Sequence, residues 1–257
     1  KYKTLVTGNT TYGQNQSAFT TVTSNTYVNL TAGQVYIQNQ AIGTAPISLY
    51  VNDVKHITKI VDTGNANTTA FSSSLSGFRD ITGSFTFDNG QRDNSYEYAR
   101  LTLLPGVSRP VGNILVCFDY YSHSGGDGYF SLQSYTNESY AQIPSYTAKD
   151  GTTYALRDCL DFRPAKQNAV TTNAWEYNNN PSSSPYNGGT LLPQNAQGII
   201  NSYSYYLGRK DLLVLTKDSQ FKVVSGSPSL RPILPDAPNG SMIIANLIHD
   251  PYTAYVP

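Results

Sequence analysis

Apolar residues in this chain fall in alternation or in short continuous runs, and turn-forming residues interrupt them at intervals of roughly ten positions. The interrupting residues are Gly, Pro, Asn, Asp and Ser, and the spacing of three and four that marks an amphipathic helix is nearly absent. This pattern leaves little room for helices. It predicts an all-β fold with β-sandwich-like modules followed by a smaller C-terminal β unit.

Eight segments within residues 1–135 are rich in β-branched or aromatic residues and are predicted to be strands. They are Phe19–Ser24, Gln34–Gln38, Ile47–Val51, Lys55–Asp62, Ser84–Asp88, Tyr96–Leu104, Asn113–Tyr121 and Tyr129–Tyr135. The segment Asn113–Tyr121 is apolar on both faces, which is typical of a central strand covered on both sides.

The amino-acid composition of the sequence changes near residue 164 and again near residue 199. Residues 1–163 are predicted to form the β-sandwich-like region, either as one module or as two that meet near residue 80. Residues 164–198 are rich in Asn, Ser and Pro and are predicted to be a polar linker. Residues 199–257 are predicted to be the C-terminal β unit. The chain begins with Lys, and we expect it to be a piece of a longer polypeptide.

The C-terminal unit contains the clearest local pattern. Asp211–Thr216 and Phe221–Ser225 flank a four-residue polar turn, which predicts a β-hairpin. The prolines between residues 228 and 238 then predict an extended, non-helical segment. A last strand is expected over Ser241–Leu247.

Charge is scarce and balanced. The 257 residues include 17 Lys and Arg against 17 Asp and Glu, without a basic cluster that would neutralise nucleic-acid phosphates or an anionic membrane. No apolar run approaches the length of a membrane span. We therefore expect no nucleic-acid partner and no membrane insertion. Ser, Thr, Asn and Gln make up 86 of the residues, a composition more common in secreted, cell-surface or virion proteins.

Residue patterns of enzymes and metal sites are missing from the sequence. His56, His123 and His249 stand far apart, and none has a second ligand at metal-binding spacing. The three Glu residues suggest no catalytic pair, and neither a nucleophile elbow nor a phosphate-binding glycine loop occurs. The sequence predicts no catalytic residue, cofactor or metal. Cys117 is read as a buried hydrophobe, and a bridge between Cys117 and Cys159 is left open.

Four segments in order resemble large virion structural proteins of contractile-tailed phages, especially phages of marine cyanobacteria. They are Ser84–Asn94, Leu115–Gly125, Leu156–Pro164 and Tyr205–Asp218. The resemblance runs from about residue 80 to the C-terminus. It implies a tail or baseplate-associated protein of the virion, assembled in the host cytoplasm, whose partners are other tail proteins and copies of itself. A trimer is expected by analogy alone.

The same segments contain the candidate interface residues. Asp158, Asp161 and Arg163 are predicted to form a hydrogen-bonded network between modules or subunits. Arg209, at the start of the hairpin, is predicted to form hydrogen bonds of the same kind. Trp175 is expected to anchor the linker, either on a neighbouring subunit or on its own module. The alternative function is a receptor-binding module that recognises host surface glycan through exposed Tyr and Asn side chains, and a third is a virion-bound hydrolase.

Overall fold

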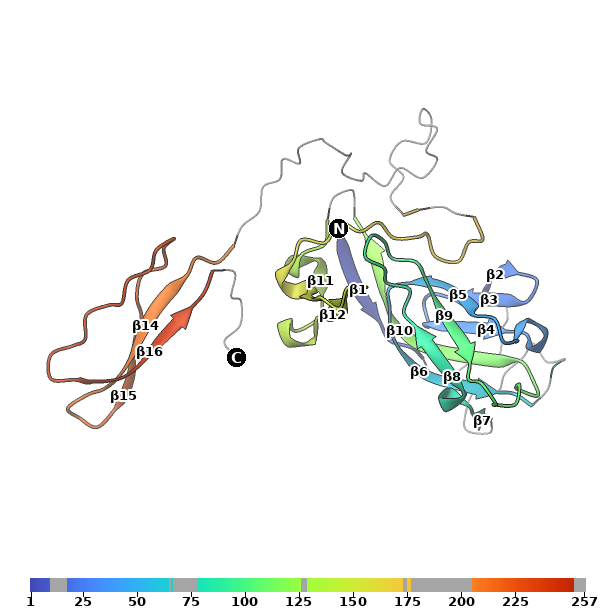
Figure 1. Ribbon diagram of the computed structural model, residues 1–257, viewed down its shortest axis with the longest axis horizontal. Coiled ribbons are helices and arrows are strands. Elements are labelled where there is room, and N and C mark those ends of the chain that lie inside the picture. The colour runs from blue at the N-terminus through green and yellow to red at the C-terminus, as the bar shows by residue number, and fades with distance from the viewer. Residues whose placement is uncertain are drawn as a thin grey trace, which may run out of the picture. The chain divides into compact units, whose positions relative to one another are not determined.

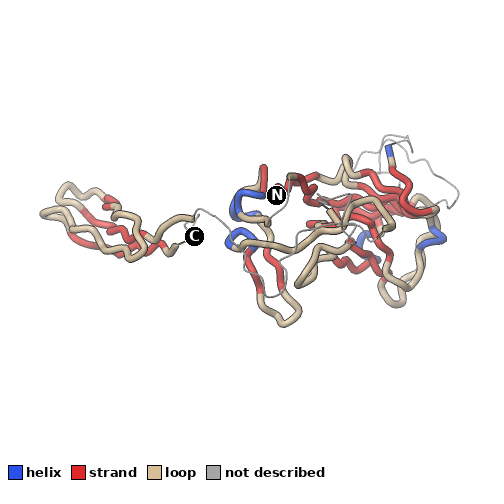
Figure 2. Tube along the Cα trace, turned by 90° about the horizontal axis from the view of Figure 1, so that it is seen from above, coloured by secondary structure: helices blue, strands red, loops and turns tan. Residues whose placement is uncertain are grey.

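The structure is a computed structural model of the 257-residue chain. It describes residues 1–9, 18–64, 66, 78–125, 129–172, 175–176 and 205–251. These residues divide into two compact units, unit 1 (Lys1–Leu192) and unit 2 (Pro193–Pro257). Their regular structure consists of β-strands and short 3-10 helices (Figures 1 and 2), which confirms the predicted all-β fold.

Unit 1 is built around an eight-stranded sheet whose central strand is β10 (Ile114–Ser124). The other strands are β1 (Tyr2–Val6), β2 (Thr20–Thr23), β3 (Thr26–Asn29), β4 (Gln34–Ile37), β6 (Val54–Asp62), β7 (Arg79–Asp80) and β11 (Tyr135–Thr136). Antiparallel β6 lies along one edge of β10. Antiparallel β4 and then β1 follow each other along the opposite edge.

A second sheet of three strands, in the order β5-β9-β8, faces the first across the core. Its strands are β5 (Ile47–Asn52), β8 (Phe85–Asp88) and β9 (Tyr98–Leu103). The core contains Val35, Ile60 and Val116 from the large sheet and Leu49 and Leu101 from the small one, each less than 2% exposed. Burying such side chains stabilises a fold by about 1.5–3 kcal/mol each. Unit 1 is therefore a β-sandwich.

The central strand β10 is covered on both faces, as its apolar sequence predicted. Val116 and Phe118 point into the sandwich core, whereas Leu115 and Cys117 pack with Phe19 on the other face of the sheet. Cys117 and Cys159 are both free. Strands from before and after residue 80 share this sheet, so the residues on the two sides of position 80 form one unit and not two modules.

A small β-hairpin and short helical turns complete unit 1. The hairpin pairs β12 (Ser145–Thr147) with β13 (Thr153–Ala155). The 3-10 helices are η2 (Asn39–Ala41), η4 (Thr82–Ser84), η5 (Leu132–Ser134), η6 (Tyr140–Gln142) and η7 (Leu156–Asp158). The prediction of a strand over Tyr129–Tyr135 is wrong, because Ser131 and Ser134 exchange side-chain-to-backbone hydrogen bonds that close the turn of η5.

The described part of the predicted linker packs on unit 1. The backbone NH of Tyr96 donates to Pro164, and the backbone NH of Ala169 donates to Tyr50. Trp175 forms an isolated β-bridge with Lys166, whose ammonium lies 5.8 Å from the Trp175 ring centroid. Residues 177–198 of the predicted linker lie outside the described residues.

Unit 2 contains a three-stranded antiparallel sheet in the order β15-β14-β16. Its strands are β14 (Arg209–Leu215), β15 (Phe221–Val224) and β16 (Met242–His249). The first two form the predicted hairpin, and the last falls where a final strand was expected. The proline-containing segment between β15 and β16 has no helix or strand, as predicted. Residues 199–204 of the predicted C-terminal unit lie outside the described residues.

Candidate functional site

Unit 1 encloses a group of ionisable side chains that contact one another in its interior, which we call the buried charge network. Its members are Lys3, Asp53, Tyr96, His123, Asp161, Arg163 and Glu176. The side chains of Lys3 and His123 are 0% exposed and that of Asp53 is 2% exposed. Charges removed from water in this way cost free energy unless each is paired and hydrogen-bonded.

The sheet register builds the first arm of the network. Lys3 on β1 lies directly opposite His123 on β10, so the two side chains leave the same face of the sheet. Both reach Asp53, whose Oδ2 lies 2.7 Å from Lys3 Nζ and 2.7 Å from His123 Nε2. His123 Nδ1 lies 2.8 Å from Glu176 Oε2. The imidazole therefore bridges two carboxylates.

Asp53 occupies the one-residue connection between β5 and β6, and its backbone has φ of 48°. A non-glycine residue takes up this left-handed conformation only where surrounding contacts hold it. The backbone carbonyl of Asp53 accepts from the NH of Tyr121 on β10 at 3.1 Å. Gln91 Nε2 donates to Asp53 Oδ1 at 3.3 Å. The Asp53 carboxylate therefore has different partners at its two oxygens, with Lys3 and His123 at Oδ2 and Gln91 at Oδ1.

The second arm joins Lys3 to Asp161 and Arg163 through a buried tyrosine. Lys3 Nζ donates to the Tyr96 hydroxyl at 2.9 Å, and that hydroxyl donates to Asp161 Oδ2. The guanidinium of Arg163 lies 2.9 Å from Asp161 Oδ2 and stacks on the rings of Tyr96 and Tyr146, each at 4.3 Å. Paired and stacked in this way, the Arg163 charge is compensated although its side chain is only 9% exposed.

The pKa values in the network follow from competition between burial and pairing. Burial alone raises the pKa of Asp53, but the charges and hydrogen bonds of Lys3 and His123 outweigh it and lower that pKa to about 2. Burial alone lowers the pKa of His123, but Asp53 and Glu176 outweigh it, and the pKa is raised. For Asp161, burial is outweighed by Arg163, and the pKa is lowered. Pairing therefore favours the charged form of each of these groups.

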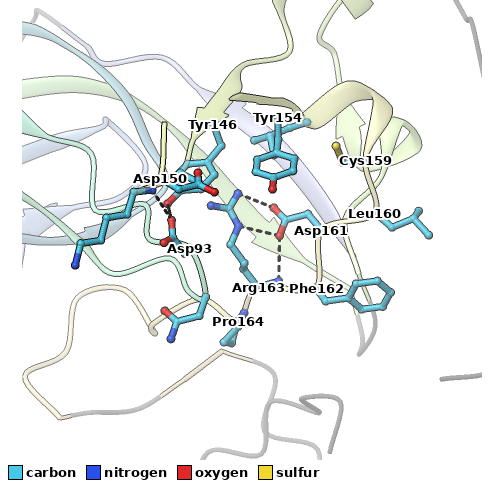
Figure 3. Close-up of a pocket in the computed structure, with 14 residues that line it drawn as sticks. Asp93, Tyr146, Asp150, Tyr154, Cys159, Leu160, Asp161, Phe162, Arg163 and Pro164 are labelled. Atoms are coloured by element: carbon cyan, nitrogen blue, oxygen red, sulfur yellow. Dashed lines mark hydrogen bonds and ion pairs between the residues drawn. The ribbon is translucent and has the colours of Figure 1, made fainter. Parts of the chain in front are cut away.

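An open pocket of about 820 Å³ lies on unit 1 where Arg163 approaches the surface. Its lining residues are Asp93, Asn94, Tyr146, Ala148, Lys149, Asp150, Tyr154, Leu156, Cys159, Leu160, Asp161, Phe162, Arg163 and Pro164. Figure 3 shows the Asp161–Arg163 pair beside Tyr154, with Tyr146 close to Asp93. The Tyr146 hydroxyl donates to Asp93 Oδ1, and the backbone NH of Lys149 donates to the same oxygen. Burial of the Cys159 thiol raises its pKa. The two hydrogen bonds to Asp93 hold its carboxylate and the Tyr146 ring in fixed positions in the pocket wall.

The predicted interface residues fall in different places. Asp161 and Arg163 contact each other inside unit 1, whereas Asp158 lies apart and accepts from the Tyr140 hydroxyl. Trp175 lies against Lys166 of unit 1. Arg209 is in unit 2, where its Nε lies 3.0 Å from the buried carboxylate of Asp211.

Sequence reasoning missed Lys3, Asp53 and Glu176, and it predicted no metal site at His123. A single charged residue in a short polar segment is usually solvated, so the sequence carried no local signal for their burial. Two of the four phage-like segments nevertheless contribute members of the network, which are His123 and the Asp161–Arg163 pair, and a third contributes Gln91, which donates to Asp53. Within the described residues, no cluster of His, Cys, Asp and Glu is suited to hold a metal ion.

Unit 2 carries an apolar sheet face. Register places Leu213, Leu215, Phe221, Val223 and Met242 on one side of the sheet. Phe221 and Met242 are 70% and 63% exposed. Among the described residues of unit 2, the only buried apolar side chains are Leu212 and Val214, which point to the opposite side. Burial of so few apolar side chains among these residues contributes little to the stability of the sheet.

None of the helices in the described part of the chain is long and apolar enough to cross a membrane. Comparison of the chain with protein-family models, curated proteins and solved structures finds no significant match.

Proposed function

We propose that this chain is a structural component of a phage virion tail, associated with the baseplate or tail fibre, that works through protein–protein assembly. The apolar sheet face of unit 2 carries the proposal, because exposed apolar surface of this extent marks an interaction site. The order of the phage-like segments supports the tail assignment. Covering Phe221 and Met242 would contribute about 1.5–3 kcal/mol for each side chain.

We assign the covering partner to a second copy of this chain. On this face, the charged side chains lie together at one end, where Arg209 and His249 both contact Asp211. The strand positions on the same face around Phe221 carry no charged side chain. Two such faces can therefore meet without burying an unpaired charge. This geometry supports a homo-oligomer, and a trimer remains the expectation by analogy alone.

Light scattering after size-exclusion chromatography tests the oligomer. The full chain should run as an oligomer, and Phe221→Ser combined with Met242→Ser should run as a monomer with unchanged circular dichroism. Val111→Ser is the matched control, because Val111 is 67% exposed but belongs to unit 1. A wild-type chain that stays monomeric at high concentration contradicts self-assembly. A density map of an intact virion in which the chain has no place in the tail contradicts the tail assignment.

A second function, recognition of host surface glycan, is favoured by the pocket of unit 1. Tyr154 is 46% exposed and can stack on a sugar ring, while the carboxylates of Asp93 and Asp150 can accept from sugar hydroxyls. A glycan array probed with the full chain tests it. Tyr154→Ala should remove a positive signal, whereas Tyr206→Ala, a change of an exposed Tyr in unit 2, should leave it. An array without signal contradicts this second function.

A further inference from the structure

We propose that Lys3 and Asp53 become joined by an amide bond between their side chains, which ties the first strand covalently to the β5–β6 connection. Lys3 Nζ lies 2.7 Å from Asp53 Oδ2. Because a carbon–oxygen bond of this kind is about 1.2 Å long, Nζ lies within about 4 Å of Asp53 Cγ. A small movement brings the nitrogen to the distance of about 3–3.5 Å at which a bound nucleophile attacks.

The surroundings of the pair are closed to bulk solvent and largely aromatic. The Lys3 ammonium lies 4.2 Å from the ring centroid of Tyr96, 4.5 Å from that of Phe130 and 5.3 Å from that of Tyr135. Both side chains of the pair are at most 2% exposed. The burial of both side chains limits access of the water that would hydrolyse the product.

Each atom whose bonding changes in the reaction has a hydrogen-bonding group next to it. Asp53 Oδ2, the oxygen that leaves, lies 2.7 Å from His123 Nε2, and Glu176 orients that imidazole from its other nitrogen. Asp53 Oδ1, where negative charge develops, accepts from Gln91 Nε2 at 3.3 Å. The Lys3 amine contacts the Tyr96 hydroxyl, which in turn donates to Asp161. The arrangement supplies an acid, an oxyanion donor and a proton path.

The reaction balances without any added reagent. Lys3 gives one ammonium proton to the Asp53 carboxylate, and the neutral amine forms a bond from Nζ to Cγ. The tetrahedral intermediate passes a second Nζ proton through Tyr96 towards Asp161. His123 donates a proton to Oδ2, which leaves Cγ as water, and the proton held near Asp161 returns to His123. An ammonium and a carboxylate are thereby converted into one amide and one water molecule, with no oxidation or reduction.

The same chain contains two matched Lys–carboxylate pairs that lack these surroundings. Lys55 Nζ lies 2.8 Å from Glu138 Oε1, and Lys166 Nζ lies 2.6 Å from Glu97 Oε2. The Lys55 side chain is 24% exposed and that of Lys166 is 18% exposed, so solvent reaches both amines. Distance alone would allow all three pairs to condense. The Lys3–Asp53 pair differs from these two pairs because both of its side chains are buried and because His123 lies beside Asp53 as the acid.

Intact mass spectrometry of the purified, denatured full chain tests the proposal. We expect a mass lower than that of the sequence by one water molecule, and a proteolytic peptide pair linked through Lys3 and Asp53. Lys3→Met and Asp53→Ala should each restore the full sequence mass, and His123→Gln should slow the loss of water. Peptides containing Lys55 and Lys166 should remain unlinked.

Wild-type protein of full sequence mass, with Lys3 and Asp53 in separate peptides, refutes the proposal even if the variants fail to fold. Loss of water that maps to another pair of residues refutes it as well. Either outcome leaves the proposed tail function untouched, because that function rests on unit 2.

Discussion

Replacing Arg163 by Ala removes one partner of a buried ion pair and leaves the other in place. The guanidinium makes 2.9 Å contacts to both oxygens of Asp161, donates to the Tyr96 hydroxyl at 2.8 Å and lies between two tyrosine rings. Without it, the Asp161 carboxylate, which is 6% exposed, loses the guanidinium that compensates its charge. Breaking a buried pair in this way costs about 3–5 kcal/mol.

For a unit of this size, that loss corresponds to a fall in the melting temperature of roughly 6–20 °C, at about 2–4 °C for each kcal/mol. Urea unfolding followed by the fluorescence of Trp175 measures the loss of unfolding free energy, since the chain has one Trp and this Trp lies in unit 1. Arg79→Ala is the control, because Arg79 also pairs with a buried carboxylate, Asp62, but is itself 61% exposed. Asp62 keeps hydrogen bonds from the backbone NH groups of Gly64, Val111 and Gly112 when Arg79 is removed, so the loss should stay near the value of about 0–1 kcal/mol measured for solvent-exposed cations.

A double variant separates the burial of charge from the loss of packing. Asp161→Leu with Arg163→Met leaves neither charge of the pair in the interior, so it should cost less than Arg163→Ala alone. Arg163→Ala with a loss no larger than that of Arg79→Ala would refute the reasoning. So would a double variant less stable than the single one.

Two further predictions concern pH and backbone packing. The raised pKa of His123 means that its contribution to stability is complete below the unfolded-state pKa of about 6.5 and is lost as the pH rises through the folded-state pKa. The free energy of unfolding should therefore fall as the pH rises above about 6.5 in the wild type, and less so in His123→Gln; parallel curves would contradict this. Gly33 has φ of 57°, and a Cβ there would lie 2.4 Å from the carbonyl oxygen of Phe118. Gly33→Ala should cost more than about 1 kcal/mol in urea unfolding, whereas Gly43→Ala, with nothing within 4 Å of the added Cβ, should be near neutral, and equal losses would contradict the packing argument.

The parts of the fold that the sequence predicts are those with a local physical cause. The apolar run around Val116 predicts a strand buried on both faces, and the polar turn after Asp211–Thr216 predicts the hairpin; both are confirmed. At the candidate site, the proximity of Asp161 and Arg163 in sequence indicated their pairing, whereas Asp158 accepts from the Tyr140 hydroxyl and makes no contact with this pair. The partners of this pair come from distant segments, which the topology alone brings together.

The location of Lys3 shows why the sequence carries no local signal for the rest of the buried charge network. Its strand is short and begins with an exposed Tyr, and a lysine in such a strand is ordinarily solvated. Only pairing of β1 with both β10 and β11 encloses it, and this pairing joins residues more than a hundred positions apart. Long-range pairing of this kind follows from the whole topology and cannot be read from a window of sequence.

Burying so many charges in a chain that has few of them calls for a reason other than stability. A buried ion network is often no more stabilising than apolar side chains of the same volume, so its presence is weak evidence for a stability role. Its effect on strand register is stronger. A slip of one residue between β1 and β10 would turn Lys3 to the opposite face of the sheet, leaving Asp53 without its cation and burying the lysine elsewhere unpaired. Apolar residues at these positions would tolerate the slip far better. The network therefore makes one register of the first strand much more favourable than its neighbours, and that same register brings the Lys3 amine to Asp53.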